Sequence, residues 1–150
     1  MMLRSYHSSD VNALISLFYE TVHTVNAKDY TAEQLDAWAP KQIDADVWDG
    51  RFLSTYTLVA ERCGEIAGFG NIGANGYLDM LYVRNSRRNE GVATHICDAL
   101  EASVSVRKVY LQASITARPF FEKRGYAVVK EQSVKRNGVI LKNYVMEKVL

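Results

Sequence analysis

The spacing of apolar residues in the first third of the chain predicts helices. Apolar residues recur every three or four positions over Val11–Val22, and the polar run Ser8–Asp10 in front of them offers a helix N-cap. A second helix is predicted to begin at Thr31–Gln34, which matches a capping box, and to end at Pro40. The stretch Asp44–Leu53 is ambiguous and fits a short helix.

Runs rich in β-branched and aromatic residues, separated by turn signals, predict strands in the rest of the chain. With an opening strand at the N-terminus, the predicted strands cover residues 2–6, 56–60, 65–70, 77–83, 109–113, 127–136 and 139–148. Helices are predicted from Gly91 and over Thr116–Arg124, the second with Pro119 in its first turn and Gly125 just past its end. Hairpins imply antiparallel neighbours and strand-helix-strand crossovers imply parallel ones, so we expect an α/β fold with a mixed sheet.

The composition fits one soluble globular domain over residues 1–150. The chain has 48% hydrophobic and 23% charged residues, and 18 basic against 17 acidic residues give a formal net charge of +1. Such a balance provides no long-range field for nucleic acid or an anionic membrane, so a bound anion must be held locally. The N-terminus lacks the layout of a signal peptide, and no apolar run approaches the roughly 20 residues of a membrane span. We therefore expect a cytoplasmic monomer or homodimer.

The cysteines indicate neither a disulfide framework nor a metal site. Cys63 and Cys97 are the only two, and no Cys/His spacing resembles a zinc site, so we expect no metal. Cys97 falls in an amphipathic pattern, which favours a small core residue over a nucleophile.

The segment Val83–Thr94 concentrates chemistry where a predicted strand ends and a helix begins. Free N–H groups and the helix dipole make such a junction an anion site. Gly91 and Ala93 are small, Thr94 offers a hydroxyl, and three arginines precede the turn: Arg84, Arg87 and Arg88. The two better-known phosphate-loop patterns, G-x-x-x-x-G-K-[ST] and G-x-G-x-x-G, are absent. Taken alone, the segment also fits a tight turn with solvated arginines.

Two motifs resemble those of the GNAT superfamily of acyl-CoA-dependent N-acyltransferases. Arg88-x-x-Gly91-x-Ala93 is similar to that family's (Gln/Arg)-x-x-Gly-x-(Gly/Ala) pyrophosphate loop, and Ala117–Tyr126 resembles its second signature. The resemblance implies a sheet splayed into a V, with acetyl-CoA as co-substrate in the opening and an amine as acceptor.

Carried over position by position, the resemblance implies a set of cofactor-binding residues. The backbone of Leu81 and Val83 would pair with the pantetheine arm, and the amides of residues 88–94 would hold the pyrophosphate. The full set is Leu81, Tyr82, Val83, Arg88, Asn89, Glu90, Gly91, Val92, Ala93, Thr94, Ser114, Phe120 and Phe121. Asn89 replaces a frequent Gly, and Glu90 brings a negative charge into the loop, which disfavours phosphate unless its side chain points to solvent.

A further departure is Phe121, which occupies the position where many relatives carry a proton-donating Tyr. Phe cannot donate a proton, but a thiol has a pKa of about 8.5, so a thiolate leaves tolerably well at neutral pH. Tyr126, Tyr82 or a water could substitute as the acid.

The acceptor amine needs to lose a proton, because at a pKa of about 10 only on the order of one molecule in a thousand is neutral at pH 7. Asp79, in phase with Leu81 and Val83, is the predicted general base, although a structural carboxylate fits equally well. His23 and Tyr30 are predicted to face the acceptor. Four aromatic residues, Phe18, Trp38, Trp48 and Tyr56, are expected in the core, with one or two lining the acceptor wall.

Three functions remain open on the sequence. The first is direct acetyl transfer to a small amine in a ternary complex, without a covalent enzyme intermediate. The second is a CoA-binding sensor that has lost catalysis. The third is acetylation of a protein N-terminus or lysine, which would need an open groove for a peptide.

Overall fold

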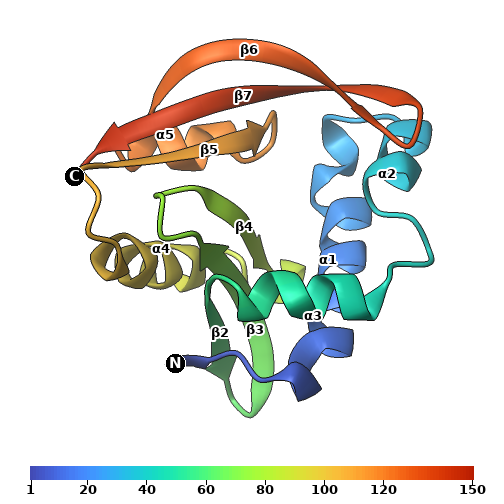
Figure 1. Cartoon of the computed structure of the whole chain (residues 1–150). Helices are drawn as coiled ribbons and strands as arrows, with labels where there is room; N and C mark the ends of the chain where they lie inside the picture. Colours follow the sequence, from blue (N-terminus) through green and yellow to red (C-terminus); the bar gives the residue numbers. More distant parts are fainter.

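Two antiparallel sheets lie at the centre of the computed structural model, which describes residues 1–150. The first sheet has the order β1-β2-β3-β4 and contains β1 (Met2–Ser5), β2 (Tyr56–Arg62), β3 (Glu65–Ile72) and β4 (Leu78–Val83). The second has the order β5-β7-β6 and contains β5 (Lys108–Ser114), β6 (Ala127–Arg136) and β7 (Val139–Val149). A single parallel bridge, Tyr77 to Tyr110, joins the two. The predicted mixed α/β fold with a splayed sheet is confirmed (Figure 1).

The helices cover the sheets on two sides. They are α1 (Val11–Thr24), α2 (Ala32–Trp38), α3 (Ala45–Leu53), α4 (Val92–Ser103) and α5 (Arg118–Lys123), with short 3-10 turns η1 (Ser8–Asp10), η2 (Asn26–Lys28) and η3 (Asn85–Arg87). In Figure 1, α1 and α2 lie on one side of the gap between the sheets and α4 on the other. No helix combines the length and apolar character needed to cross a bilayer.

Local signals account for the ends of the early helices. The Thr31 hydroxyl accepts a hydrogen bond from Gln34 N at 3.2 Å, and the Gln34 side chain accepts one from Thr31 N at 2.9 Å, so the predicted capping box forms. The ambiguous stretch after α2 folds as α3 because Asp44 caps it, accepting from the amides of Asp46 and Val47.

The predicted hairpin turns also form. Cys63 and Asn137 have φ values of 54° and 48°, and each is followed by a glycine with positive φ. Consecutive left-handed residues match the right-handed twist of the flanking strands, which is why Asn-Gly and similar pairs are favoured there.

Two apolar clusters flank the first sheet, and β4 contributes to both. Leu78 packs in the cluster beneath α4, whereas Met80 packs in the cluster formed with α1, α2 and α3. The Cys97 side chain is fully buried, as predicted for a core residue. Tyr56 was wrongly expected in the core: it begins β2 at the sheet margin and is 46% exposed.

Candidate functional site

The β4 strand presents one backbone edge to β3 and leaves the other facing the gap. Arg84 N donates to Ala67 O at 2.8 Å, and hydrogen-bonded pairs alternate along an antiparallel ladder. The N–H and C=O groups of Val83 and Leu81 therefore point away from β3. An extended ligand chain can add to such an edge as an extra strand.

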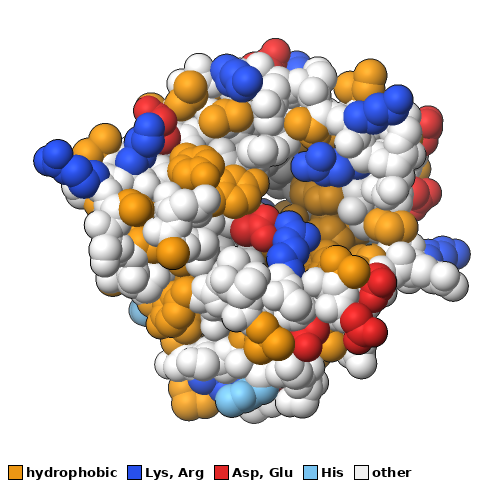
Figure 2. Space-filling view, viewed as in Figure 1, with side chains coloured by type: hydrophobic (Ala, Val, Ile, Leu, Met, Phe, Trp, Pro, Cys, Tyr) orange, Lys and Arg blue, Asp and Glu red, His pale blue; other side chains and the backbone are white.

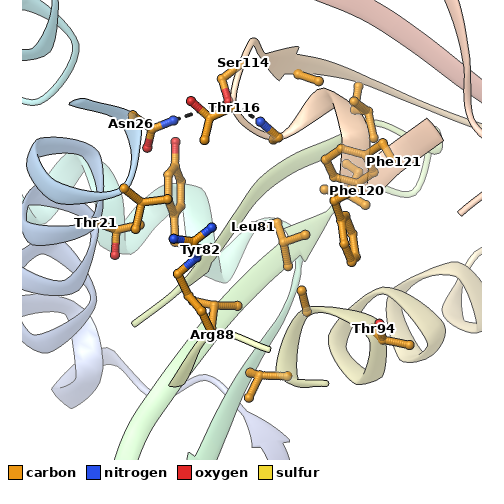
Figure 3. Close-up of a pocket in the computed structure, with 18 of the residues that line it drawn as sticks. Thr21, Asn26, Leu81, Tyr82, Arg88, Thr94, Ser114, Thr116, Phe120 and Phe121 are labelled. Carbon is orange, nitrogen blue, oxygen red and sulfur yellow. Dashed lines mark hydrogen bonds between the residues drawn. The ribbon is translucent and has the colours of Figure 1, made fainter. Parts of the chain in front are cut away.

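A cleft of about 520 Å³ opens along this edge. Its walls come from α1, η2, β4, the start of α4, β5 and α5, and Figure 3 shows their side chains converging on one space. The predicted cofactor residues that line it are Leu81, Tyr82, Val83, Arg88, Asn89, Gly91, Val92, Ala93, Thr94, Ser114, Phe120 and Phe121. Glu90 is the one member of the predicted set that does not line the cleft.

The turn into α4 leaves backbone donors free at one end of the cleft. The first helical bond is His95 N to Gly91 O at 3.1 Å, so the amides of Val92, Ala93 and Thr94 have no partner within the helix. Gly91 adopts a left-handed φ of 80°. These three donors, together with the helix dipole, form an anion-binding geometry.

Asn89 shows why a frequent glycine can be replaced in this loop. Its φ is 65°, and asparagine tolerates the left-handed region better than other non-glycine residues. The departure from the family pattern therefore leaves the loop conformation accessible.

The charged side chains of the loop divide between the cleft and the outer surface. Arg88 lines the cleft and has no acidic partner within 4.0 Å. Arg87 lines it too but is paired with Glu65 at 3.3 Å. Glu90 does not line the cleft and pairs with Arg62 of β2 at 2.7 Å and with Arg87 at 3.7 Å, so its charge is offset by these two arginines. Arg84 is directed elsewhere and donates to Ile66 O at 3.0 Å.

A second cavity of about 450 Å³ adjoins the cleft. It lies between α1, the α2–α3 region, β4 and the β6–β7 hairpin. Figure 2 shows an apolar hollow on this face, with an acidic and a basic side chain next to each other at its edge. The residues that line both spaces, and so define their junction, are Trp38, Asp79, Tyr82, Gln112 and Ser114.

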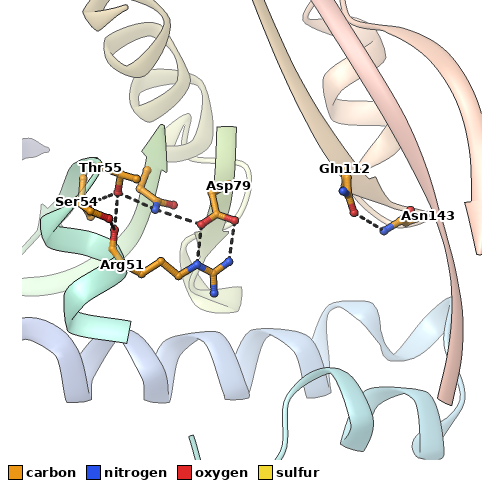
Figure 4. A network of polar contacts seen from close by, with 8 residues as sticks. Arg51, Ser54, Thr55, Asp79, Gln112 and Asn143 are labelled. Atoms are coloured by element: carbon orange, nitrogen blue, oxygen red, sulfur yellow. Dashed lines mark hydrogen bonds and ion pairs between the residues drawn. The ribbon is translucent and has the colours of Figure 1, made fainter. Parts of the chain in front are cut away.

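Asp79 lies at a β-bulge within this junction. Ile72 pairs with Leu78 and Asn71 with Met80, which leaves Asp79 without a partner on β3, and bulges commonly re-aim side chains. Its carboxylate accepts hydrogen bonds from Arg51 at 2.8 and 2.9 Å, as Figure 4 shows. Both oxygens are engaged, and a carboxylate has about four lone-pair sites, so some accepting capacity remains.

Tyr82 places a phenol at the same junction. Its ring packs edge-on against Phe18 with centroids 5.0 Å apart. Burial raises the pKa of the Tyr82 hydroxyl above its usual value, so the group stays protonated near neutral pH. The side chain can therefore act as a hydrogen-bond or proton donor toward the cleft.

Ser114 is fixed at the junction from two sides. Its Oγ accepts from Ala117 N at 3.0 Å and from Asn26 Nδ2 at 3.4 Å. The hydroxyl hydrogen stays available to a ligand, because a hydroxyl donates one bond and accepts up to two.

Phe121 packs as an apolar wall. It is 4% exposed, and its ring contacts those of Phe120 and Tyr126 at centroid distances of 5.2 and 5.3 Å. The ring therefore contributes apolar packing to the cleft wall.

Two predicted site residues lie outside both spaces. The Tyr126 hydroxyl is buried and donates to Glu101 Oε2 at 2.9 Å, so this geometry does not support a role as the acid. His23 Nε2 donates to Ala39 O at 2.8 Å, which ties the end of α1 to the end of α2. His23 therefore makes a structural contact at this position.

Tyr30 lines the second cavity with its ring, while its hydroxyl is used for structure. It donates to Lys142 O at 2.6 Å and accepts from Ile115 N at 2.9 Å. Of the aromatic residues expected in the core, Phe18, Trp38 and Trp48 pack there and also line this cavity.

Several polar residues of the cleft were not predicted from the sequence, namely Thr21, Asn26, Gln112 and Thr116. Gln112 could have been found, because it alternates in phase with Ser114 on β5. Asn26 and Thr116 reach the cleft through tertiary contacts, Asn26 with Ser114 and Thr116 with Asp29 at 2.7 Å. No local sequence pattern indicates these tertiary contacts.

Comparisons with known proteins agree on one family. The family model described as Acetyltransferase (GNAT) domain matches residues 26–148. The chain is 32% identical over 146 residues to the uncharacterized N-acetyltransferase YafP of Escherichia coli K12, covering 97% of this chain and 94% of YafP. A crystal structure of a GCN5-related N-acetyltransferase from Rhodopseudomonas palustris superposes with a TM-score of 0.96 at 32% identity, covering 99% of this chain and 95% of that one.

A more distant likeness concerns a structure with bound cofactor. The PaiA N-acetyltransferase of Thermoplasma acidophilum, solved in complex with coenzyme A, matches with a TM-score of 0.78 at 16% identity, covering 99% of this chain and 98% of that one. At that identity the likeness shows a shared fold.

Proposed function

Because this chain belongs to the GNAT family of N-acetyltransferases, we propose that it transfers the acetyl group of acetyl-CoA directly to a primary amine held in the second cavity. One observation carries the proposal: the cleft and the second cavity meet at Asp79, Tyr82 and Ser114, so a thioester and an amine can approach one another there. The coenzyme A bound to the Thermoplasma relative supports the cofactor.

In this proposal the cofactor is held mainly by backbone groups. The amides of Val92, Ala93 and Thr94 and the unpaired Arg88 bind the pyrophosphate. The pantetheine arm adds to the free edge of β4 at Leu81 and Val83, and Phe120 and Phe121 pack beside the thioester.

The transfer itself needs one nucleophile and two proton movements. The amine nitrogen attacks the thioester carbonyl carbon, a C–N bond forms, the C–S bond breaks and the CoA thiolate leaves. Asp79 accepts the proton that the amine loses, and the Tyr82 hydroxyl donates to the departing sulfur. A thiolate is a tolerable leaving group, so the donor contributes less here than in many acyl transfers.

Direct transfer is favoured by where the two thiols lie. Cys97 is 0% exposed, and burial raises the pKa of its thiol to about 12, so it carries almost no thiolate at neutral pH. Cys63 is exposed in the β2–β3 turn, and neither cysteine lines the cleft or the second cavity. An acetyl-cysteine intermediate therefore has no suitable thiol.

The test combines acetyl-CoA titration by calorimetry with release of CoA thiol in the presence of an amine panel. We expect stoichiometric binding and amine-dependent thiol release. Binding without transfer to any amine would instead support a CoA-binding sensor. Transfer only to peptides would support a protein acetyltransferase.

A further inference from the structure

We propose that the acceptor is a primary amine on a flat apolar body that carries a negatively charged group remote from the amine, with Arg136 binding that group. This inference rests on the proposed function, since it takes the second cavity as the acceptor site. It follows from the shape and charge of that cavity's wall.

Aromatic rings form a substantial part of the wall. Those that line the cavity are Phe18, Tyr30, Trp38, Trp48, Tyr77 and Tyr82. The rings of Phe18 and Trp48 meet edge-on with centroids 4.8 Å apart, and Tyr30 and Trp38 do so at 5.4 Å. Rings that hold one another in this way form a rigid wall, which suits a flat apolar or aromatic ligand.

The two acidic side chains of the cavity, Asp44 and Asp79, both accept hydrogen bonds within the protein. Asp44 accepts hydrogen bonds from the amides of Asp46 and Val47 at 3.0 and 3.3 Å, as the cap of α3. Asp79 is held by Arg51 through two hydrogen bonds. The charge of Asp79 is therefore offset by Arg51 and that of Asp44 by the N-terminus of α3, so the second cationic group of a polyamine would have to compete with these partners.

The basic side chains, by contrast, leave one positive charge without a partner. Arg51 pairs with Asp79, and Lys142 pairs with Glu131 at 3.5 Å. Arg136 lines the cavity and has no acidic group within 4.0 Å. Arg136 is exposed at the end of β6, so its guanidinium is accessible to a ligand in the cavity. A guanidinium binds carboxylate or phosphate through paired hydrogen bonds.

The positions of these groups determine the orientation of the bound ligand. Asp79 and Tyr82 belong to both the cleft and the second cavity, whereas Arg136 lines only the second, near the β6–β7 turn. The amine must reach the junction to meet the thioester. The negative group therefore lies at the far end of the body from the amine.

Three probe amines test this: 4-(aminomethyl)benzoate, benzylamine and spermidine. The first two differ only by the remote carboxylate. We expect wild type to show a kcat/KM at least about tenfold higher for 4-(aminomethyl)benzoate than for benzylamine, because one charge-assisted hydrogen bond stabilises binding by that factor. Spermidine should have the lowest kcat/KM of the three. Arg136→Gln should bring the ratio of the first two close to one. Comparing two probes on one variant cancels a general loss of active protein.

The matched control is Lys135→Gln. Lys135 neighbours Arg136 on β6, is exposed and lines neither space, so its substitution should preserve the ratio. Equal use of both aromatic amines, a preference that survives Arg136→Gln, or a preference for spermidine would overturn the inference. Each of these outcomes includes acetyl transfer and leaves the proposed function standing.

A binding measurement separates the two proposals if turnover is not seen. The probes are titrated calorimetrically into CoA-loaded wild type and Arg136→Gln. Tighter binding of 4-(aminomethyl)benzoate than of benzylamine, lost in Arg136→Gln, would support the inference although transfer had failed. Equal or absent binding of the two would overturn it.

Discussion

Asp79 illustrates how a single side chain depends on its immediate partners. The bulge aims it into the junction, and Arg51 holds both of its oxygens at 2.8 and 2.9 Å. Asn71, fully buried on β3, contacts the same carboxylate more weakly at 3.5 Å. This network fixes the orientation of Asp79 and leaves it room for one more proton or hydrogen bond.

The first prediction at this scale is that Asp79→Asn lowers the acetylation rate at neutral pH by about 100-fold or more while CoA affinity is kept. The deficit should shrink as the pH rises, because more of the amine is then already neutral. The measurement is a pH–rate profile of both proteins with one confirmed acceptor. Parallel profiles, together with lost stability, would instead make Asp79 a structural residue.

Phe121 gives the second residue-scale prediction. Because the ring is buried against two others, Phe121→Leu should cost about 1 kcal/mol of stability and leave measurable turnover. Phe121→Tyr should change the rate by less than tenfold, since the thiolate leaves without a strong acid. A tenfold or larger gain in steady-state assays would show that the missing acid limits the reaction.

At the scale of elements, the turn between β4 and α4 determines how the cofactor is held. A side chain at position 91 would meet nothing nearer than His95 at 3.6 Å, so the site has open space, but φ is 80° there. A non-glycine residue at that φ costs about 1–2 kcal/mol. Backbone strain and blocked space can therefore be separated by substitution.

We predict that Gly91→Trp abolishes the thermal stabilisation of the protein by CoA, because the indole fills the space in front of the free amides. Gly91→Ala is the matched control: it carries the same backbone strain without the bulk, so the unliganded protein loses about 1 kcal/mol but a CoA-dependent shift persists. Differential scanning fluorimetry at several CoA concentrations measures both. An unchanged shift in Gly91→Trp would contradict this location of the pyrophosphate.

At the scale of the whole molecule, Glu101 joins three elements behind the site. It lies on α4 and accepts from Arg124 Nε at 2.6 Å, from Tyr126 OH at 2.9 Å and from Lys148 Nζ at 2.9 Å. Its side chain is 10% exposed. The cluster attaches α5 and β7 to α4, and both helices contribute walls to the cleft.

We predict that Glu101→Gln lowers the free energy of unfolding at pH 7 by about 1–3 kcal/mol, because Lys148 loses its anionic partner and Arg124 keeps only Asp98. Burial raises the pKa of Glu101, but the hydrogen bonds from Arg124, Lys148 and Tyr126 outweigh it, so the pKa is lowered. The contribution of Glu101 to stability is therefore fully present above the pKa of glutamate in the unfolded chain, about 4.3. It is lost as the pH falls through the pKa of Glu101 in the folded protein.

Urea unfolding of wild type and Glu101→Gln at pH 7 and at about pH 3 measures this difference. The control is Glu122→Gln, which removes an exposed ion pair with Arg118 and should change stability by at most about 0.5 kcal/mol. If the difference in free energy of unfolding between wild type and Glu101→Gln grew on acidification, the stabilising role of ionised Glu101 would be contradicted.

Sequence patterns sufficed where short-range chemistry decides the structure. The Thr31 cap, the Asn137-Gly138 turn and the Gly91 junction each depend on residues within a few positions, so all three could be predicted. The contacts of Tyr126 and His23 could not be predicted, because their partners Glu101 and Ala39 lie 25 and 16 positions away in the sequence.

The second cavity was harder still to predict. Its wall combines residues from Phe18 to Asn143, which only the packing of α1 and the β6–β7 hairpin brings together. Aromatic residues such as Trp38 look like core in the sequence because they pack there, and they also line the cavity. No local pattern distinguishes these two roles.

Direct transfer in a ternary complex is the central claim, and initial-velocity kinetics with acetyl-CoA and 4-(aminomethyl)benzoate test it most directly. Since neither Cys63 nor Cys97 lines the cleft, we predict double-reciprocal lines that intersect, and no acetylated protein by mass spectrometry when acetyl-CoA is added alone. Parallel lines, together with an acetylated protein that passes its acetyl group to the amine, would contradict the account.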